Sequence, residues 1–294
     1  MKRQMILGTD WWTDCDDAVA LRLLARAHVK GEVQLLGVVI NACMEYSVAS
    51  LRGFLDTEGV GEVPIGIDLA ATDFGGAPPY QRRLATNFRP EMSNRDAEDA
   101  VRLYRRLLSE ATEPVEMLEI GFLQAVRALL DSPPDEISPK TGCELVREKV
   151  KKLWVMAGKW DGDGERENNF ARNERARVAA AAFCRTCPVP VTFLGFEVGC
   201  DVVTGKDLRE DDPLYGVLSD FGSPQGRESW DPMLVMLALI GDEAAAGYRT
   251  VRGTASVDPL TGFNYFVRSD GGPHAFVVKQ RSDEYYENYI NSRL

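Results

Sequence analysis

The sequence of 294 residues contains only two histidines and no long apolar run. No stretch approaches the roughly 20 apolar residues that a helix needs to span a bilayer, so we expect no membrane partner. The apolar part of the N-terminal segment 1–10 is also shorter than the ~7–15 residues of a signal-peptide core. We therefore interpret this segment as a first strand and expect a cytoplasmic protein.

Cysteine is scattered along the chain rather than grouped. Cys184 and Cys187 form one Cys-x-x-Cys pair, but no second pair follows it, and His28 and His274 are the only histidines. A structural zinc site needs four such ligands at regular spacing, so the sequence argues against one. We expect the six cysteines to be reduced thiols.

An excess of positive charge is also missing. The chain carries 34 basic and 45 acidic residues, which gives a formal net charge of -11. Binding to a phosphate backbone or to an anionic lipid surface requires a basic face, so we expect neither nucleic acid nor membrane as a partner. Hydrophobic residues make up 45% of the chain, which is typical of a globular protein with a core.

What the sequence does contain is a regular alternation of strand-like and helix-like segments over its first two-thirds. Apolar strand patterns fall at 4–10, 33–41, 63–67, 114–121, 152–158 and 189–196. Helical patterns fall at 16–29, 47–59, 96–110, 122–132 and 174–185, and we expect a loop at 68–93. Such alternation predicts an α/β fold with a mostly parallel central sheet and helices on both faces. Ligands of such folds bind at the carboxyl ends of the strands.

The last third has a different pattern. We expect a helix at 229–241 with Asp231 as its N-cap and Pro232 at its first position. A β-hairpin at 248–268, a strand at 274–280 and a C-terminal helix beginning at Ser282 complete the prediction. The sequence has no internal repeat and no long linker, so we expect one domain over residues 1–294.

The segment TDWWTDCDDA, residues 9–18, places Asp10, Asp14, Asp16 and Asp17 in a single turn after the first strand. Two carboxylates ~4 Å apart repel by about 4 kcal/mol at an effective dielectric constant of ~20. A helix N-terminus stabilises acids by only ~0.3–1 kcal/mol each, which does not account for all four. A divalent cation does, because hard cations take several carboxylate oxygens from one loop.

Polar residues follow other strands of the predicted sheet. Asn41 ends the second strand, Ile120 lies at the end of the fourth, and a polar loop after the fifth contains Glu167 and Asn169. Carboxylate and amide groups suit sugar hydroxyls, each of which both donates and accepts hydrogen bonds. A solvated loop is the simpler interpretation of the segment around Glu167.

Tryptophans follow the same strand ends. Trp11 and Trp12 lie in the acidic turn, and Trp160 follows the fifth strand. Their indole rings can stack on a planar base or a sugar, although packing in the core is the commoner role of tryptophan.

Together these motifs resemble the inosine–uridine-preferring nucleoside hydrolase family. Members of that family begin with a strand that ends in Asp-x-Asp-Pro-Gly-x-Asp-Asp-Ala, and ILGTD and DDAVAL match this motif from both sides if the turn carries two extra residues. The family's Glu-Phe-Asn segment is similar to residues 167–169, and its His-Asp-Pro segment resembles residues 230–232. The resemblance covers roughly residues 4–290 and implies the Rossmann-like architecture of nucleoside hydrolases.

The resemblance also implies a bound Ca²⁺ and roles for individual residues. The ligands implied for the calcium ion are the carboxylates of Asp10, Asp17 and Asp231 and a main-chain carbonyl near Ile120. Asp10 is also implied as the general base that activates water. The substrate-binding positions, combined with those suggested by the strand ends, are Asp16, Asn41, Trp160, Glu167, Asn169 and Trp230.

Two departures from the family pattern affect these assignments. The Pro-Gly turn is replaced by WWTDC, and an alignment without the two extra residues places Trp12 at the general-base position. Trp230 stands where the family has the histidine implicated as the acid for the leaving base. Stacking of the base on tryptophan is one way to replace that acid.

The sequence therefore predicts calcium-dependent hydrolysis of the N-glycosidic bond of a ribonucleoside, by a homodimer or homotetramer as the resemblance implies. A non-catalytic protein that binds calcium and a nucleoside or sugar stays open as an alternative. A magnesium-dependent phosphatase with an aspartyl nucleophile is a third, but such enzymes need Asp-x-Asp, and the residue two after Asp10 is Trp12.

Overall fold

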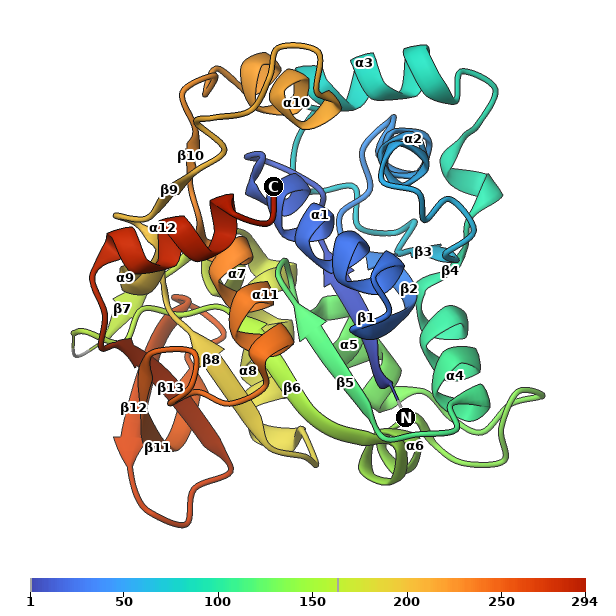
Figure 1. Ribbon diagram of the computed structural model, residues 1–294. Helices are drawn as coiled ribbons and strands as arrows, with labels where there is room; N and C mark the ends of the chain where they lie inside the picture. Colours follow the sequence, from blue (N-terminus) through green and yellow to red (C-terminus); the bar gives the residue numbers. More distant parts are fainter. Residues whose placement is uncertain (1, 163) are drawn as a thin grey trace.

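The computed structural model describes residues 2–162 and 164–294, and its centre is an eleven-stranded sheet. The strand order is β4-β3-β2-β1-β5-β6-β8-β13-β11-β12-β7. All neighbouring pairs from β4 to β13 are parallel, whereas β11, β12 and β7 continue the sheet in antiparallel pairs. The predicted α/β class with a mostly parallel sheet and helices on both faces is confirmed (Figure 1).

The strands have the following bounds. Those of the large sheet are β1 Arg3–Thr9, β2 Val33–Ile40, β3 Ile65–Ile67, β4 Glu98–Asp99, β5 Val115–Glu119, β6 Val150–Met156, β7 Glu165–Arg166, β8 Val191–Leu194, β11 Tyr248–Val257, β12 Phe263–Arg268 and β13 His274–Lys279. Two further strands, β9 Val203–Thr204 and β10 Arg227–Glu228, form a small antiparallel pair.

The helices are α1 Asp16–Val29, α2 Ser47–Thr57, α3 Pro79–Phe88, α4 Ala100–Glu110, α5 Gln124–Asp131, α6 Gly142–Lys149, α7 Asn168–Ala171, α8 Glu174–Thr186, α9 Phe196–Gly199, α10 Pro213–Phe221, α11 Trp230–Ile240 and α12 Asp283–Asn291. A 3₁₀ turn, η1, covers Asn94–Asp96. None of these helices, in the described part of the chain, is long and apolar enough to cross a membrane.

Alternating side chains of the strands build two separate cores, one on each face of the sheet. In β1, Met5 and Leu7 pack into the core that contains α1, α2, α11 and α12, whereas Ile6 packs into the core that contains α4, α5, α6 and α8. Successive side chains of a strand point to opposite faces, so a strand buried on both faces needs a continuous apolar run. Figure 1 shows α1, α11 and α12 in front of the sheet and α5 and α8 behind it.

The structure differs from the sequence prediction in several elements. The expected loop at 68–93 contains α3, and α6 and α10 were not predicted. Helix α11 begins at Trp230 with Ser229 as its N-cap, so the prediction of Asp231 as N-cap is wrong. Asp231 instead lies in the first turn of the helix, where its carboxylate is not used to cap the backbone.

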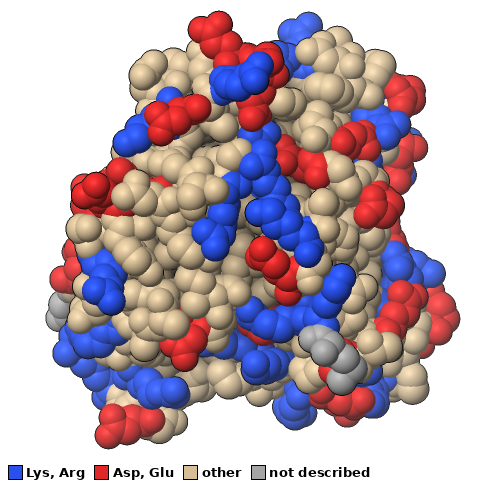
Figure 2. All heavy atoms as spheres, viewed as in Figure 1, with Lys and Arg blue, Asp and Glu red and all other residues tan. Residues whose placement is uncertain are grey.

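Charge on the surface is mixed. On the face shown in Figure 2, basic and acidic side chains are interspersed, and a group of basic side chains lies near the middle of the face, around α1. The net charge of -11 is therefore not spread evenly over this face.

Candidate functional site

A cavity of about 220 Å³ opens at the carboxyl ends of the central strands. It is smaller than the ~300–1,000 Å³ of sites for drug-sized ligands, and it suits a small polar group with the rest of the ligand at the mouth. Of the predicted site residues, the structure brings eight to its wall: Asp10, Asp16, Asp17, Ile120, Glu167, Asn169, Trp230 and Asp231. We call Asp10, Asp14, Asp16, Asp17 and Asp231 the acidic lining, and Trp12, Phe196 and Trp230 the aromatic lining.

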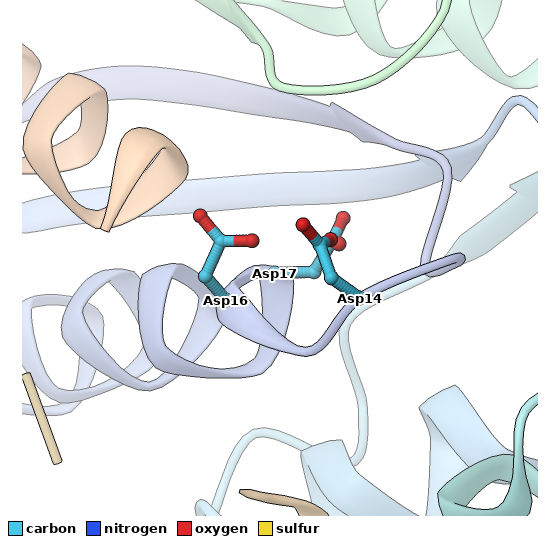
Figure 3. A group of neighbouring side chains, drawn as sticks. All are labelled: Asp14, Asp16 and Asp17. Carbon is cyan, nitrogen blue, oxygen red and sulfur yellow. The ribbon is translucent and has the colours of Figure 1, made fainter. Parts of the chain in front are cut away.

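The turn between β1 and α1 supplies most of the acidic lining. Asp16 and Asp17 lie in the first turn of α1, and Asp14 lies in the turn before it (Figure 3). One carboxylate oxygen from each of these three residues lies within 4.8 Å of the others, which is close enough to share one ion. The predicted ligand set names Asp10, and the register of the turn leaves open whether Asp10 or Asp14 meets the metal.

Trp11 fixes the shape of this turn. Its backbone has φ of 51°, a left-handed conformation that costs a bulky residue about 1–3 kcal/mol. Its carbonyl accepts hydrogen bonds from Tyr80 Oη at 3.1 Å and Gln81 Nε2 at 2.6 Å, and its indole Nε1 donates to Ser50 Oγ at 2.8 Å. These bonds offset the backbone cost, and the side chain is 0% exposed. Trp11 therefore holds the turn in place and does not stack on a ligand.

Asp10 and Asp17 are buried beside each other at the start of the turn. Asp10 Oδ1 accepts a hydrogen bond from the Trp12 amide at 3.0 Å, and Asp17 accepts bonds from the Thr9 hydroxyl and, at 3.2 Å, from the Trp11 amide. Burial, followed by the charges of Asp17 and Asp14, raises the pKa of Asp10 well above its ordinary value. Burial and then the charge of Asp14 raise the pKa of Asp17 to about 8.

Asp16 and Asp231 meet although they lie 215 positions apart in the chain. The Asp231 amide donates to Asp16 Oδ2 at 3.0 Å, which ties the start of α11 to the start of α1. In the described part of the chain, no protein group donates a hydrogen bond to the Asp231 carboxylate. Burial and then the charge of Asp16 raise the pKa of Asp231 well above its ordinary value.

Glu167 and Asn169 come from the loop before α8 and are held by backbone contacts. Glu167 caps α7 and accepts hydrogen bonds from the amides of Asn169 at 2.7 Å and Gly158 at 2.9 Å. Burial raises its pKa to about 7. Asn169 Nδ2 donates to the Met156 carbonyl at 2.9 Å and lies 3.4 Å from the Ile120 carbonyl. The loop is thus ordered by the strand ends that it covers.

Two predicted substrate-binding residues do not line the cavity. Asn41 is fully buried, and its Oδ1 accepts a hydrogen bond from the Phe122 amide at 2.9 Å. A Cβ atom at Gly121 would collide with the Asp10 nitrogen and lie 2.7 Å from Asn41 Oδ1, so only glycine fits between the two residues. Asn41 therefore supports the strand end that carries Asp10 and has no contact with the cavity.

Trp160 is the second predicted substrate-binding residue that does not line the cavity. Its indole packs against Phe193 and Phe276, with ring centroids 5.3 and 5.9 Å away, and its Nε1 donates to the Ala157 carbonyl at 3.1 Å. It is a core tryptophan behind the site, because the aromatic residues of β8 and β13 enclose it.

The aromatic lining is formed by rings from three elements. Trp230 stacks on Phe196, with ring centroids 5.3 Å apart and planes inclined by 25°, and its Nε1 donates to the Phe196 carbonyl at 2.8 Å. Phe196 is 40% exposed. Trp12 donates its Nε1–H to the Gly76 carbonyl at 2.8 Å and has the guanidinium of Arg172 over its ring at 4.8 Å.

Neither histidine lies at this cavity. His274 is buried in β13, where its Nδ1 accepts a hydrogen bond from the Ala255 amide at 2.9 Å and burial lowers its pKa to about 4. His28 is near the end of α1, and its Nδ1 accepts from the Leu35 amide at 2.9 Å. Arg227 is the basic residue on the cavity wall that the sequence gave no reason to select.

The fold is similar to that of solved nucleoside hydrolase structures. No protein-family model and no curated protein sequence matches the chain. Solved structures do match: a nucleoside hydrolase from Bacillus anthracis that prefers inosine and uridine has 16% sequence identity and a TM-score of 0.67, with all of both chains covered. The predicted resemblance is thereby confirmed for the fold.

Two further structures have the same fold. The type III effector protein XopQ, solved in complex with adenosine diphosphate ribose, has 16% identity and a TM-score of 0.70, covering 100% of this chain and 93% of its own. A nucleoside hydrolase-related protein from Saccharophagus degradans, associated with carbohydrate metabolism, has 11% identity and a TM-score of 0.51, covering 100% of this chain and 71% of its own. At these identities the likeness concerns the fold.

Proposed function

We propose that the chain hydrolyses the N-glycosidic bond of ribonucleosides and requires Ca²⁺ to do so. The observation that carries this proposal is the acidic lining itself. Asp10, Asp16, Asp17 and Asp231 are all buried in one cavity, and none of them forms an ion pair in the described part of the chain. So many unbalanced buried carboxylates are strongly unfavourable unless a cation or bound protons neutralise them.

The residues present fit a calcium ion. The acidic lining offers oxygen donors only, which hard cations prefer, and the Asp231 carboxylate is free of protein hydrogen bonds in the described part of the chain. We propose Asp10, Asp17, Asp231 and the Ile120 carbonyl as ligands. In the described part of the chain, the three carboxylates within 4.8 Å of one another are those of Asp14, Asp16 and Asp17, so Asp14 and Asp16 are further candidate ligands. Asn169 Nδ2 lies near the Ile120 carbonyl, which has a second lone pair for another partner.

The mechanism follows from the chemistry of these side chains. When bound, calcium would lower the pKa of a water molecule and orient it. Asp10 would accept the proton from that water as the general base. Asp16, Glu167 and Asn169 would hold the ribose hydroxyls, and their negative charge and dipoles would stabilise the oxocarbenium-like transition state.

The names of the similar structures support ribose as the group that enters the cavity. Inosine, uridine and adenosine diphosphate ribose all contain a ribose ring, although they differ in everything attached to it. We propose that the shared ribose enters the acidic lining and that the variable group lies at the aromatic lining, where Phe196 is 40% exposed.

The test is the release of free reducing sugar from a panel of purine and pyrimidine nucleosides, with and without a chelator. We expect release that the chelator abolishes and that added calcium restores. Phosphate release from a generic ester in the same assay would instead support the phosphatase alternative.

A non-catalytic role is the second candidate, and the absence of both histidines from the cavity wall favours it. In that case calcium and a nucleoside would bind, as measured by calorimetry, but no nucleoside of the panel would be cleaved. A homodimer or homotetramer, to be measured by light scattering, and a cytoplasmic location both stay predictions.

A further inference from the structure

Arg227 contacts both linings of the cavity. It lies on β10, three residues before the start of α11. Its Nη2 is 3.2 Å from Asp14 Oδ2 in the acidic lining, and its guanidinium lies over the ring of Trp230 in the aromatic lining, 5.2 Å from the ring centroid. It is also the one basic side chain on the wall of this cavity among the described residues. If ribose occupies the acidic lining, Arg227 is next to the group attached to it.

The guanidinium retains donors for a ligand. An arginine carries five N–H groups. Arg227 uses one on Asp14 and another, from Nη1, on Glu228 Oε2 at 2.6 Å. Its Nε has no partner among the described residues but is buried, so the donors left for a ligand are the remaining N–H groups of Nη1 and Nη2. The side chain is therefore held rigidly by two carboxylates while part of its hydrogen-bonding capacity stays unused.

The aromatic lining offers no group that can protonate a leaving base. No histidine, lysine, tyrosine or cysteine lines the cavity among the described residues. Arg227 cannot serve as an acid, because a guanidinium keeps its protons at any physiological pH. An aglycone stacked against Trp230 thus has the Arg227 guanidinium beside it, whereas the acidic groups of the cavity belong to the acidic lining and to Glu167.

We infer that Arg227 determines specificity by stabilising an aglycone that departs as an anion, so that the preferred substrates are N-ribosides of acidic heterocycles such as uracil. This inference rests on the proposed function. In the step, the water oxygen bonds to C1′ and its proton passes to Asp10, while the C1′–N bond breaks and its electron pair stays on the base. The anionic base leaves beside Arg227 and takes its proton from solvent.

The experiment compares kcat/KM for three ribosides in the presence of calcium. Uridine releases uracil, 5-fluorouridine releases a more acidic base, and nicotinamide riboside releases a neutral pyridine that needs neither a proton nor a cation. The variants are Arg227→Gln, which removes the charge, and Arg227→Lys, which keeps it. Arg209→Gln is the matched control, because this arginine is 83% exposed and, among the described residues, pairs only with Asp211.

We expect wild type to cleave 5-fluorouridine faster than uridine. Loss of one preorganised donor to a developing anion costs about 10²–10³-fold, so we expect Arg227→Gln to lose about that factor on uridine. We expect a loss of less than about 10-fold on nicotinamide riboside, because electrostatic stabilisation acts on charge that develops in the transition state. Arg227→Lys should lie between wild type and Arg227→Gln on uridine, and Arg209→Gln should equal wild type.

Three results would overturn the inference. Equal losses of Arg227→Gln on all three ribosides would reduce Arg227 to a structural role. Equal wild-type rates on uridine and 5-fluorouridine would mean that the base does not leave as an anion, and this comparison needs no variant to fold. Cleavage of none of the three by wild type would refute the proposed function as well, which separates the two failures.

Discussion

The two linings of the cavity are built on different principles. Every carboxylate of the acidic lining except Asp14 is fully enclosed, and backbone amides or the start of a helix fix their positions. The aromatic lining instead includes Phe196, which is 40% exposed, on the four-residue helix α9. A buried cluster of like charges suits one small cation, whereas a partly exposed ring such as that of Phe196 can stack on planar groups of different shape. Under the proposed function, the buried lining would hold the cation and the ribose, and the more exposed lining would select the base.

Removal of one carboxylate from the acidic lining should have the largest effect on activity. We expect Asp10→Asn to lower kcat for nucleoside hydrolysis by about 10²–10⁴-fold, because the amide cannot accept the proton from water. The measurement is release of reducing sugar with calcium in excess. Asp211→Asn is the control, since this carboxylate is exposed and does not line the cavity. Full activity of Asp10→Asn would mean that another residue of the turn is the base.

Calcium should stabilise the fold through the same lining. A ligand at 100 times its dissociation constant that binds only the native state raises the free energy of unfolding by about 2.7 kcal/mol. We expect an increase of this size in urea unfolding when calcium is added to protein freed of metal. Sodium at matched ionic strength is the control. An unchanged midpoint with calcium would contradict the assignment of the acidic lining as a metal site.

Substitutions in the aromatic lining should lower kcat/KM less than those in the acidic lining, and the size of the loss should depend on the substrate. Stacking of a base on an aromatic side chain contributes about 1–3 kcal/mol, so we expect Trp230→Ala to reduce kcat/KM on nucleosides by roughly 10-fold or more. The loss should be much smaller on a riboside with a good leaving group that is not a nucleobase. Trp160→Phe is the comparison variant, since this tryptophan packs in the core and does not line the cavity. If Trp230→Ala lowers kcat/KM equally on both kinds of substrate, the base does not stack on Trp230.

The pH dependence of stability gives the smallest effect. The pKa of Asp17 is raised from 3.8 to about 8 in the folded protein. Between these values the native state binds more protons than the unfolded state, so the free energy of unfolding falls as pH rises. We expect this fall in metal-free protein between pH 6.5 and 8, above the ordinary pKa of His274. Saturation with calcium should flatten it, because the cation holds the carboxylates ionised, and an identical slope in both states would argue against bound calcium.

Much of the fold and of the acidic lining was predictable from the sequence. Strands buried on both faces are continuous apolar runs, and the carboxyl ends of parallel strands meet at one edge of the sheet. Acids that follow these strands, such as Asp10 and Asp17, therefore gather at one place without further information. The same argument brought Glu167 and Asn169 to the cavity, because their loop follows β6.

The parts that the sequence could not predict depend on contacts between distant segments. Helix α3 has a mostly polar sequence, so it looked like a loop, yet its Tyr80 and Gln81 hold the carbonyl of Trp11. Trp160 and Trp230 both come near strand ends, and only the packing of β8 and β13 decides that the first lies in the core. Arg227 carried no motif, because its role arises from Asp14, which is 213 positions away.

The hydrogen bond that the Asp231 amide donates to the Asp16 carboxylate has a kinetic consequence. It joins residues 215 positions apart, so the acidic lining is assembled only when α11 docks on α1. Contacts of such large sequence separation form late in folding, since the chain must first pay the entropy of closing a long loop. The repulsion among the carboxylates therefore does not hinder the early steps of folding. An ion bound at this place stabilises the native state and slows unfolding. Calcium would accordingly lengthen the lifetime of the folded protein by slowing unfolding, while leaving the rate of refolding nearly unchanged.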